Sequence, residues 1–196
     1  AWAQFPAFAK ANGIDIDKIK VEPVGFPTRE PMLAEGKVDS VTGFSFSSYL
    51  NLVRLGVPED DITTMLMADH GLQLYGNAVI ANTDFAKSNP DIVKKFLSAV
   101  GSGWKDAIKS PKTAAAALVK RNPAADAALE QRRLQLAINA NVLTDFVKAN
   151  GMGRIDEDRF AVAIKQLGET YDYKTAPDAK LYFTGAYLPD GGILLQ

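Results

Sequence analysis

The strongest constraint on this chain is a regular alternation of predicted helices and short apolar strands across its first eighty or so residues. The hydrophobic spacing predicts helices at 2–12, 28–36 and 46–55, and strands at 19–24, 38–42, 63–68 and 79–81. Short connections between alternating helices and strands favour a mostly parallel sheet with helices on its faces. The first half is therefore predicted to be an α/β structure.

The second half has a different pattern and is predicted to be helical. Amphipathic helices are expected at 90–110, 111–121, 124–149 and 156–169, followed by an irregular tail. Asn150-Gly151 should end the third of these helices, and Asp156 should cap the fourth. These helices need a surface to pack on, and the first helix of the chain starts without a cap. We therefore expect further sequence upstream.

Composition excludes several kinds of chemistry. The chain has 196 residues, a formal net charge of −1 and no cysteine. A charge so close to zero gives no argument for binding nucleic acid, and the lack of cysteine excludes disulfides, thiolate catalysis and cysteine metal ligands. His70 is the only histidine, so a three-histidine zinc site cannot form. We expect neither a metal nor a cofactor.

Small, polar and aromatic residues follow three of the predicted strands. Gly25-Phe26 follows the first, Gly43-Phe44-Ser45 the second, and Asp69-His70-Gly71 the third. Ligands of open parallel sheets bind just beyond the carboxyl ends of the strands. Three such exits in succession therefore indicate a ligand cleft. Structural alternatives remain open: Phe26 and Phe44 as core residues, and Asp69 and His70 as ordinary turn residues.

The segments "MLAEGKVDSVTGF", "ADHGLQLYGNAVIANTDFAKSNPDIVKKFLSAVGSGWKDAIKSPKTAAAAL" and "YLPDGG" carry a resemblance to a known family. Their order and spacing resemble the substrate-binding proteins of ABC importers, in the group that binds sulfonates, nitrate, taurine and thiamine-pyrimidine precursors. The resemblance implies a type II periplasmic binding protein fold, with two α/β lobes and a hinge. Residues 1–74 would form lobe two without its first strand. Residues 75–196 would form a crossover and the C-terminal helical part of lobe one, whose first part would be missing.

The resemblance implies capture of a solute rather than catalysis. A small organic molecule would be enclosed between the lobes, outside the cytoplasm, and delivered to the transmembrane subunits of an ABC permease. The resemblance also implies a signal peptide upstream. The expected ligand contacts come from the strand exits, the chain start and the crossover, and are Trp2, Phe26, Gly43, Phe44, Ser45, Asp69, His70, Tyr75 and Asn77. The aromatic residues at the exits favour a ring-containing ligand. An anionic ligand would need an arginine in the cleft, and Arg29 is the only arginine near a predicted exit.

Three alternatives stay open at this point. Fungal thiamine-pyrimidine synthases share the implied fold and use pyridoxal phosphate, but they also use a cysteine-rich motif that this chain lacks. A ligand-binding sensor domain is the second alternative. The third is a self-associating fragment, in which helices that expect a covering surface form a dimer or bind a companion segment.

Overall fold

The computed structural model describes residues 2–171, 173–175, 177–189 and 192–195. The chain divides into two compact units. Unit 1 comprises Ala1–Leu74 and Ala161–Pro177, and unit 2 comprises Tyr75–Phe160 and Asp178–Gln196. The helix α9 (Glu157–Thr170) contributes residues to both. The two-lobe arrangement predicted from the sequence is a different division, because it assigns residues 161–177 to lobe one with the rest of 75–196 and not to the lobe of residues 1–74. It stays a prediction.

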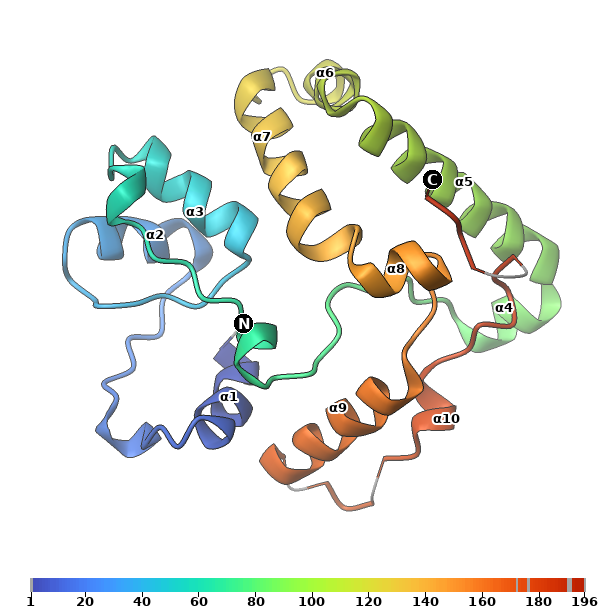
Figure 1. The fold of residues 1–196 in the computed structure, drawn as a ribbon, viewed down its shortest axis with the longest axis horizontal. Coiled ribbons are helices and arrows are strands. Elements are labelled where there is room, and N and C mark those ends of the chain that lie inside the picture. Colours follow the sequence, from blue (N-terminus) through green and yellow to red (C-terminus); the bar gives the residue numbers. More distant parts are fainter. Residues whose placement is uncertain (1, 172, 176, 190–191, 196) are drawn as a thin grey trace. The chain divides into compact units, whose positions relative to one another are not determined.

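Unit 1 is built from short helices joined by extended chain (Figure 1). Its elements are η1 (Trp2–Gln4), α1 (Phe5–Ala11), η2 (Ile16–Lys18), α2 (Phe26–Ala34), α3 (Ser45–Arg54), η3 (Glu59–Asp61), η4 (Met67–His70) and the later part of α9. The helices α2 and α3 pack side by side, and α1 packs on η4. A small core forms where Phe8 of α1 meets Leu72, with Phe5, Met67 and Leu74 around it. This core fixes the start of the chain beside the segment that carries His70.

Unit 2 is a succession of helices, of which those from α4 to η5 each pack on the next. They are α4 (Thr83–Ser88), α5 (Pro90–Lys109), α6 (Pro111–Arg121), α7 (Ala127–Ala137), the π turn η5 (Ile138–Val142), α8 (Asp145–Asn150) and α10 (Ala179–Tyr182). Contacts join α4 to α5, α5 to α6, α6 to α7 and α7 to η5. None of the helices in the described ranges combines the length and the apolar character that crossing a membrane requires.

The C-terminal tail holds two elements of unit 2 together. Ile193 forms an isolated antiparallel bridge with Met152, in which each backbone amide donates to the other residue's carbonyl, at 2.8 and 3.0 Å. The Ile193 side chain is buried against Gly101 in the middle of α5. Figure 1 shows the tail running beside α5. The tail therefore joins α5 to the turn that follows α8.

Most predicted helices form, with two corrections. The second helix was expected over 28–36, but α2 spans Phe26–Ala34 because Pro27, with its fixed φ, fits the first turn. The long helix expected over 124–149 is broken into α7, η5 and α8. Thr144 is the reason for the second start, because its hydroxyl accepts from the Val147 amide at 3.2 Å and caps α8. Asp156 caps α9 as predicted, accepting from the Arg159 amide at 2.9 Å.

The four predicted strands do not form a sheet within the described residues. Ile19, Ile62 and Leu66, which flank or lie in two of them, have extended backbones, but the only β contact in the described ranges is the bridge in the tail. A strand is stable only when its backbone groups pair with a neighbour, and local sequence cannot supply that neighbour. The apolar side chains stay exposed as a result: Ile80 is 91% exposed.

Candidate functional site

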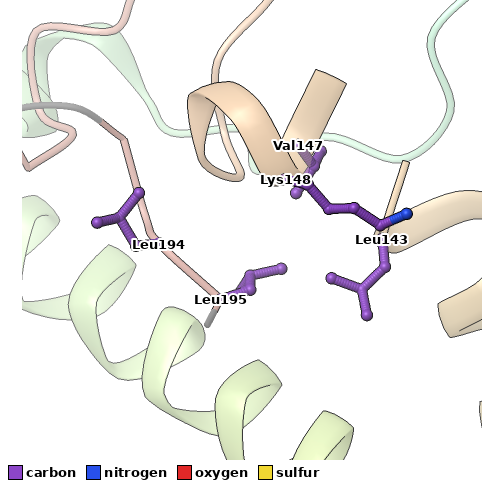
Figure 2. A pocket seen from close by; sticks show the side chains of 5 residues that line it. All are labelled: Leu143, Val147, Lys148, Leu194 and Leu195. Carbon is purple, nitrogen blue, oxygen red and sulfur yellow. The ribbon is translucent and has the colours of Figure 1, made fainter. Parts of the chain in front are cut away.

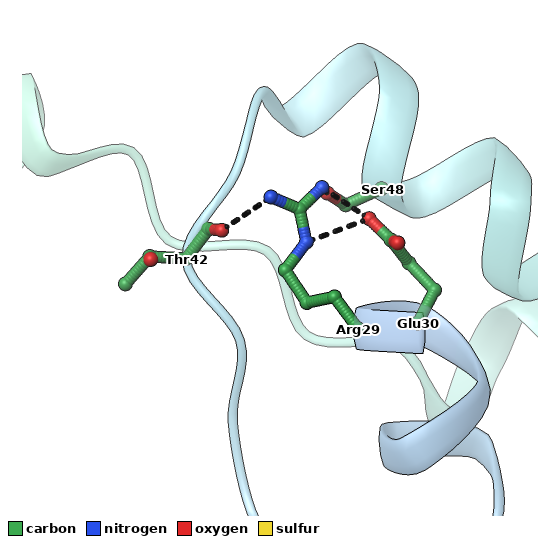
Figure 3. A network of polar contacts seen from close by, with 4 residues as sticks. All are labelled: Arg29, Glu30, Thr42 and Ser48. Atoms are coloured by element: carbon green, nitrogen blue, oxygen red, sulfur yellow. Dashed lines mark hydrogen bonds and ion pairs between the residues drawn. The ribbon is translucent and has the colours of Figure 1, made fainter. Parts of the chain in front are cut away.

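Two of the predicted strand exits are joined by one side chain, Arg29 of α2 (Figure 3). Its Nε and Nη2 atoms donate to Glu30 Oε1 at 3.0 and 2.5 Å. Its Nη1 atom donates to the Thr42 carbonyl at 2.8 Å, and Nη2 also donates to the Ser48 hydroxyl at 3.1 Å. Arg29 therefore ties the helix after the first exit to the chain that enters the second exit.

Gly43 is required at the second exit because the Arg29 network approaches its backbone closely. A Cβ atom at this position would lie 2.3 Å from Ser48 Oγ and 2.8 Å from Arg29 Nη2, which is shorter than atoms tolerate. The next residues, Phe44 and Ser45, are the N-cap and first residue of α3. Phenylalanine has no side-chain acceptor, so the Phe44 side chain does not cap the first turn of α3 and is free of that role.

Phe26 and Phe44 present their rings to solvent at the two exits. Phe26 is 80% exposed and Phe44 is 54% exposed, so the alternative that they are core residues is wrong. The Arg29 guanidinium carbon lies 5.4 Å from the centre of the Phe26 ring, within the range of a cation–π contact. Phe44 stacks on Phe46 with 5.5 Å between ring centres. Each ring is thus supported by a neighbour and keeps an open face.

Glu30 is almost completely buried beside Arg29, with 2% of its surface exposed. Burial raises the pKa of a carboxyl group, but hydrogen bonds from Arg29, Ser48 and the Glu30 backbone amide, together with the Arg29 charge, outweigh burial and lower the pKa of Glu30. Glu30 is therefore held as a carboxylate at neutral pH. A buried charge of this kind needs its partner, which makes the Arg29–Glu30 pair a fixed part of unit 1.

A second cluster of predicted residues lies at the start of the chain. Trp2 stacks on Phe5 at 5.0 Å, Phe5 lies 5.9 Å from Phe8, and Phe8 forms a T-shaped pair with His70 at 6.3 Å between ring centres. The Asn12 side chain also donates to the His70 carbonyl at 2.9 Å. Trp2 and His70, which are far apart in sequence, therefore belong to one aromatic row. Trp2 and His70 are exposed at its two ends.

The chain after His70 is held by a residue from the far end of the sequence. The Gln166 side chain of α9 accepts from the Gln73 amide at 2.9 Å and donates to the Gly71 carbonyl at 2.6 Å. Gly71 has φ +87°, the left-handed conformation that ends η4 and that glycine adopts without strain. Asp69 lies exposed in this short helix. The third exit is thus fixed by α9.

The two predicted contacts from the crossover belong to unit 2. The Tyr75 hydroxyl accepts from the Asp156 amide at 2.9 Å and donates to the Asp156 carbonyl at 3.3 Å. Its ring packs on Phe160 and lies under the Arg159 guanidinium, 5.1 Å away. Asn77 is exposed on non-helical chain. The hydroxyl of Tyr75 is therefore used to hold the start of α9.

Unit 2 contains a pocket whose lining includes none of the predicted residues (Figure 2). It measures about 370 Å³ including the open solvent at its mouth, and its lining is Leu143, Val147, Lys148, Leu194 and Leu195. Lys148 forms an ion pair with Asp145 at 3.0 Å. No group of three or more acidic or histidine side chains is placed to hold a metal ion in the described part of the chain.

Sequence reasoning missed the residues that organise the site. Arg29 was noted only for its place near an exit, Ser48 only as one of the hydroxyl groups after the second strand, and Glu30 and Gln166 were not considered. Arg29 and Glu30 are adjacent at the start of a helix, a pattern typical of a solvated surface, and nothing local shows that Glu30 is buried. Gln166 lies 95 residues from Gly71, so its role could only be found in three dimensions.

A comparison with curated proteins finds no match. The family described as "NMT1/THI5 like" matches residues 2–114, more than half of the chain. That range includes all the predicted strand exits, the Arg29 network and the aromatic row that leads to His70. Members of this family are mostly solute-binding proteins, and the family implies a type II periplasmic binding fold. The chain belongs to the NMT1/THI5-like family.

Proposed function

We propose that this protein is an extracytoplasmic solute-binding protein that captures a small organic molecule and delivers it to an ABC permease. Family membership supports solute binding, with permeases as the general partners. The observation that carries the proposal is the Arg29 network, which brings the first two strand exits together and leaves the Phe26 and Phe44 rings exposed beside Gly43. Exposed aromatic faces on a fixed support are what a planar solute would need.

The proposed contacts divide by the role that each side chain can take. Phe26 and Phe44 would stack on the solute, and Ser45 would donate a hydrogen bond from its hydroxyl group. Trp2 would enclose an apolar part, and Asp69 and His70 would bind an amine or a polar edge. Asn77 would hydrogen-bond from the crossover, whereas Tyr75, whose hydroxyl is engaged by Asp156, would contribute its ring.

The proposed mechanism is the closure of two lobes about a hinge, which is the motion associated with this fold. The solute shifts the population to the closed form because it makes more contacts there. The closed form is then the state that docks on the permease. This account uses no covalent step.

A binding screen tests the proposal. The probes are taurine, an alkanesulfonate, nitrate, thiamine and an aminopyrimidine, each added to the purified chain while the thermal unfolding midpoint is recorded. A bound solute raises the midpoint in a saturable manner, because it binds the folded state only. A screen in which no solute raises the midpoint contradicts the proposal.

Variants locate the binding site. Phe26→Ala and Phe44→Ala should each weaken binding of the best solute by about tenfold, the loss expected for a stacking face. Phe85→Ala is the matched control, because Phe85 is a similarly exposed phenylalanine of unit 2 that was not assigned to the site. Equal losses in all three variants would show that the exits do not form the site.

A pyridoxal phosphate enzyme is the competing function. Incubation with the cofactor should give no protein-bound absorbance band in the near ultraviolet if the protein only binds solutes. A stable band that borohydride fixes to a lysine would favour the enzyme and displace the proposal.

Exposed apolar side chains on unit 2 lead us to include a macromolecular partner. Ile80, Ile92 and Phe96 are all more than half exposed, and exposed apolar patches often mark interaction surfaces. The expected partner is a second copy or a companion segment. Sedimentation at increasing protein concentration tests this. A protein that remains a monomer at every concentration would contradict self-association.

A further inference from the structure

Arg29 carries the positive charge nearest the strand exits, and such a charge would attract an anionic solute. That charge is already paired with Glu30. Glu30 Oε1 accepts from both Nε and Nη2, and a carboxylate at 2.5 Å cancels most of the field that the guanidinium would project. The Arg29 side chain is only 16% exposed. Two further donors are used by Thr42 and Ser48.

The pairing cannot be relaxed to make room for an anion. Glu30 is buried, so moving Arg29 toward a solute would leave a carboxylate without its partner and without water, an arrangement that is strongly unfavourable. The Thr42 carbonyl would lose its donor at the same time. An anion beside Arg29 would also be repelled by the carboxylate behind it. The lowered pKa of Glu30 agrees with a charge that persists at neutral pH.

We propose that Glu30 is a specificity-determining residue: by neutralising Arg29 it makes the paired exits at Phe26 and Gly43–Ser45 a site for neutral or cationic ring-containing molecules, and not for small anions. This inference rests on the proposed function, since it concerns the same site. It assigns Arg29 a positioning role, in which it supports the Phe26 ring and holds Thr42, instead of contacting the solute's charge.

The aromatic groups at the exits fit the same class of ligand. Phe26 and Phe44 offer ring faces, whose negative quadrupole attracts a cation and whose area favours a flat ring. Arg29 occupies one side of Phe26, so the opposite side is the one available. A carboxylate or sulfonate would meet ring faces and the buried Glu30 charge, all of which disfavour an anion.

Sodium sulfate and sodium nitrate are the probes for this inference, with sodium chloride at matched ionic strength as the reference. The unaltered chain should show no saturable rise in its unfolding midpoint beyond that of chloride. The Glu30→Gln variant keeps the shape of the side chain but removes its charge. It should therefore bind sulfate or nitrate at least about tenfold more tightly than the unaltered chain, which is the gain expected for a newly available charged donor. Glu35→Gln, on the exposed carboxylate that pairs with Lys37 at the end of the same helix, is the matched control and should behave as the unaltered chain.

Saturable sulfate or nitrate binding by the unaltered chain, or no gain in a folded Glu30→Gln variant, overturns the inference. Circular dichroism shows whether that variant folds. If it does not, the unaltered chain is titrated with benzamidine, benzamide and benzoate, which share one ring and differ in charge. The two non-anionic compounds should bind at least about tenfold more tightly than benzoate; equal binding, or no binding, is the contrary result.

The outcome separates this inference from the proposed function. Saturable binding of an organic sulfonate by the unaltered chain, weakened by Phe26→Ala, would retain solute capture at the exits and overturn the role of Glu30. The opposite result is an unaltered chain that binds no solute in the screen, together with a Glu30→Gln variant that binds sulfate. It would contradict solute capture and retain the role of Glu30.

Discussion

Ile193 packs its branched side chain into the space that Gly101 leaves open on α5. A Cβ atom on Gly101 would lie 2.4 Å from Ile193 Cγ2, so the absence of a side chain is what allows the tail to reach the helix. The same isoleucine bridges to Met152, which makes it the point where the tail, α5 and the end of α8 meet.

The first prediction concerns that contact. Gly101→Ala should lower the free energy of unfolding by about 1–3 kcal/mol, because the methyl group must displace Ile193 or bend the helix. Gly103→Ala is the control: its Cβ would meet nothing within 4 Å, and alanine is the better helix former. Urea unfolding of the two variants measures both. A Gly101→Ala protein as stable as Gly103→Ala would contradict the packing.

The second prediction concerns the turn at the candidate site. Gly43→Ala should destabilise unit 1 and weaken solute binding, because the new methyl group would collide with Ser48 Oγ and Arg29 Nη2. Adding Ser48→Ala removes the closer obstacle, so the double variant should recover part of the stability, by about 0.5–2 kcal/mol of coupling. Gly76→Ala has open space around it and serves as the control. Strictly additive effects would show that the two residues do not touch.

The third prediction is a dependence of stability on pH. Because the pKa of Glu30 lies below its ordinary value of 4.5 in the folded protein, its ion pair stabilises the fold fully above that value and less as pH falls through the folded pKa. The difference in unfolding midpoint between the unaltered chain and Glu30→Gln should therefore be largest near neutral pH and shrink on acidification below 4.5. A difference that stays constant from neutral to acidic pH would mean that the carboxylate contributes nothing through its charge.

The fourth prediction concerns Tyr75. Tyr75→Phe should lower stability by about 0.5–1.5 kcal/mol, since it removes the partner of the Asp156 amide at the start of α9. Tyr182→Phe, at an exposed position in α10, should change little. Amide hydrogen exchange offers a local readout: the Asp156 amide should exchange faster in Tyr75→Phe and at the normal rate in Tyr182→Phe. Unchanged exchange in both would show that the hydroxyl is not its partner.

The helices were the part of the fold that the sequence could predict, because each is determined by signals a few residues apart. Pro90 and Pro111 lie in the first turns of α5 and α6, and Asp156 caps α9. The break at η5 was missed because the apolar spacing runs on through it, while the Thr144 cap that restarts the helix is a single hydroxyl. The long apolar pattern predicted one continuous helix, whereas the Thr144 hydroxyl determines where the second helix begins.

The strands and the site depended on distant partners, and for that reason were predicted less well. The extended segments have the expected composition, but a strand pairs with a chain that its own sequence does not specify. The exits were predicted as a group from strand order, and the structure joins two of them through Arg29. The burial of Glu30 followed from the packing of α2 on α3, which no spacing rule expresses.

The hydrogen bonds that Gln166 makes to Gly71 and Gln73 have a consequence for synthesis on the ribosome. The segment that carries His70 leaves the exit tunnel long before its partner, with 93 residues between Gln73 and Gln166. At about 5–20 residues per second, roughly five to twenty seconds pass before those bonds can form. During that interval the Gly71 carbonyl and the Gln73 amide lack their Gln166 partner, so unit 1 stays incomplete until residues 161–177 have been made.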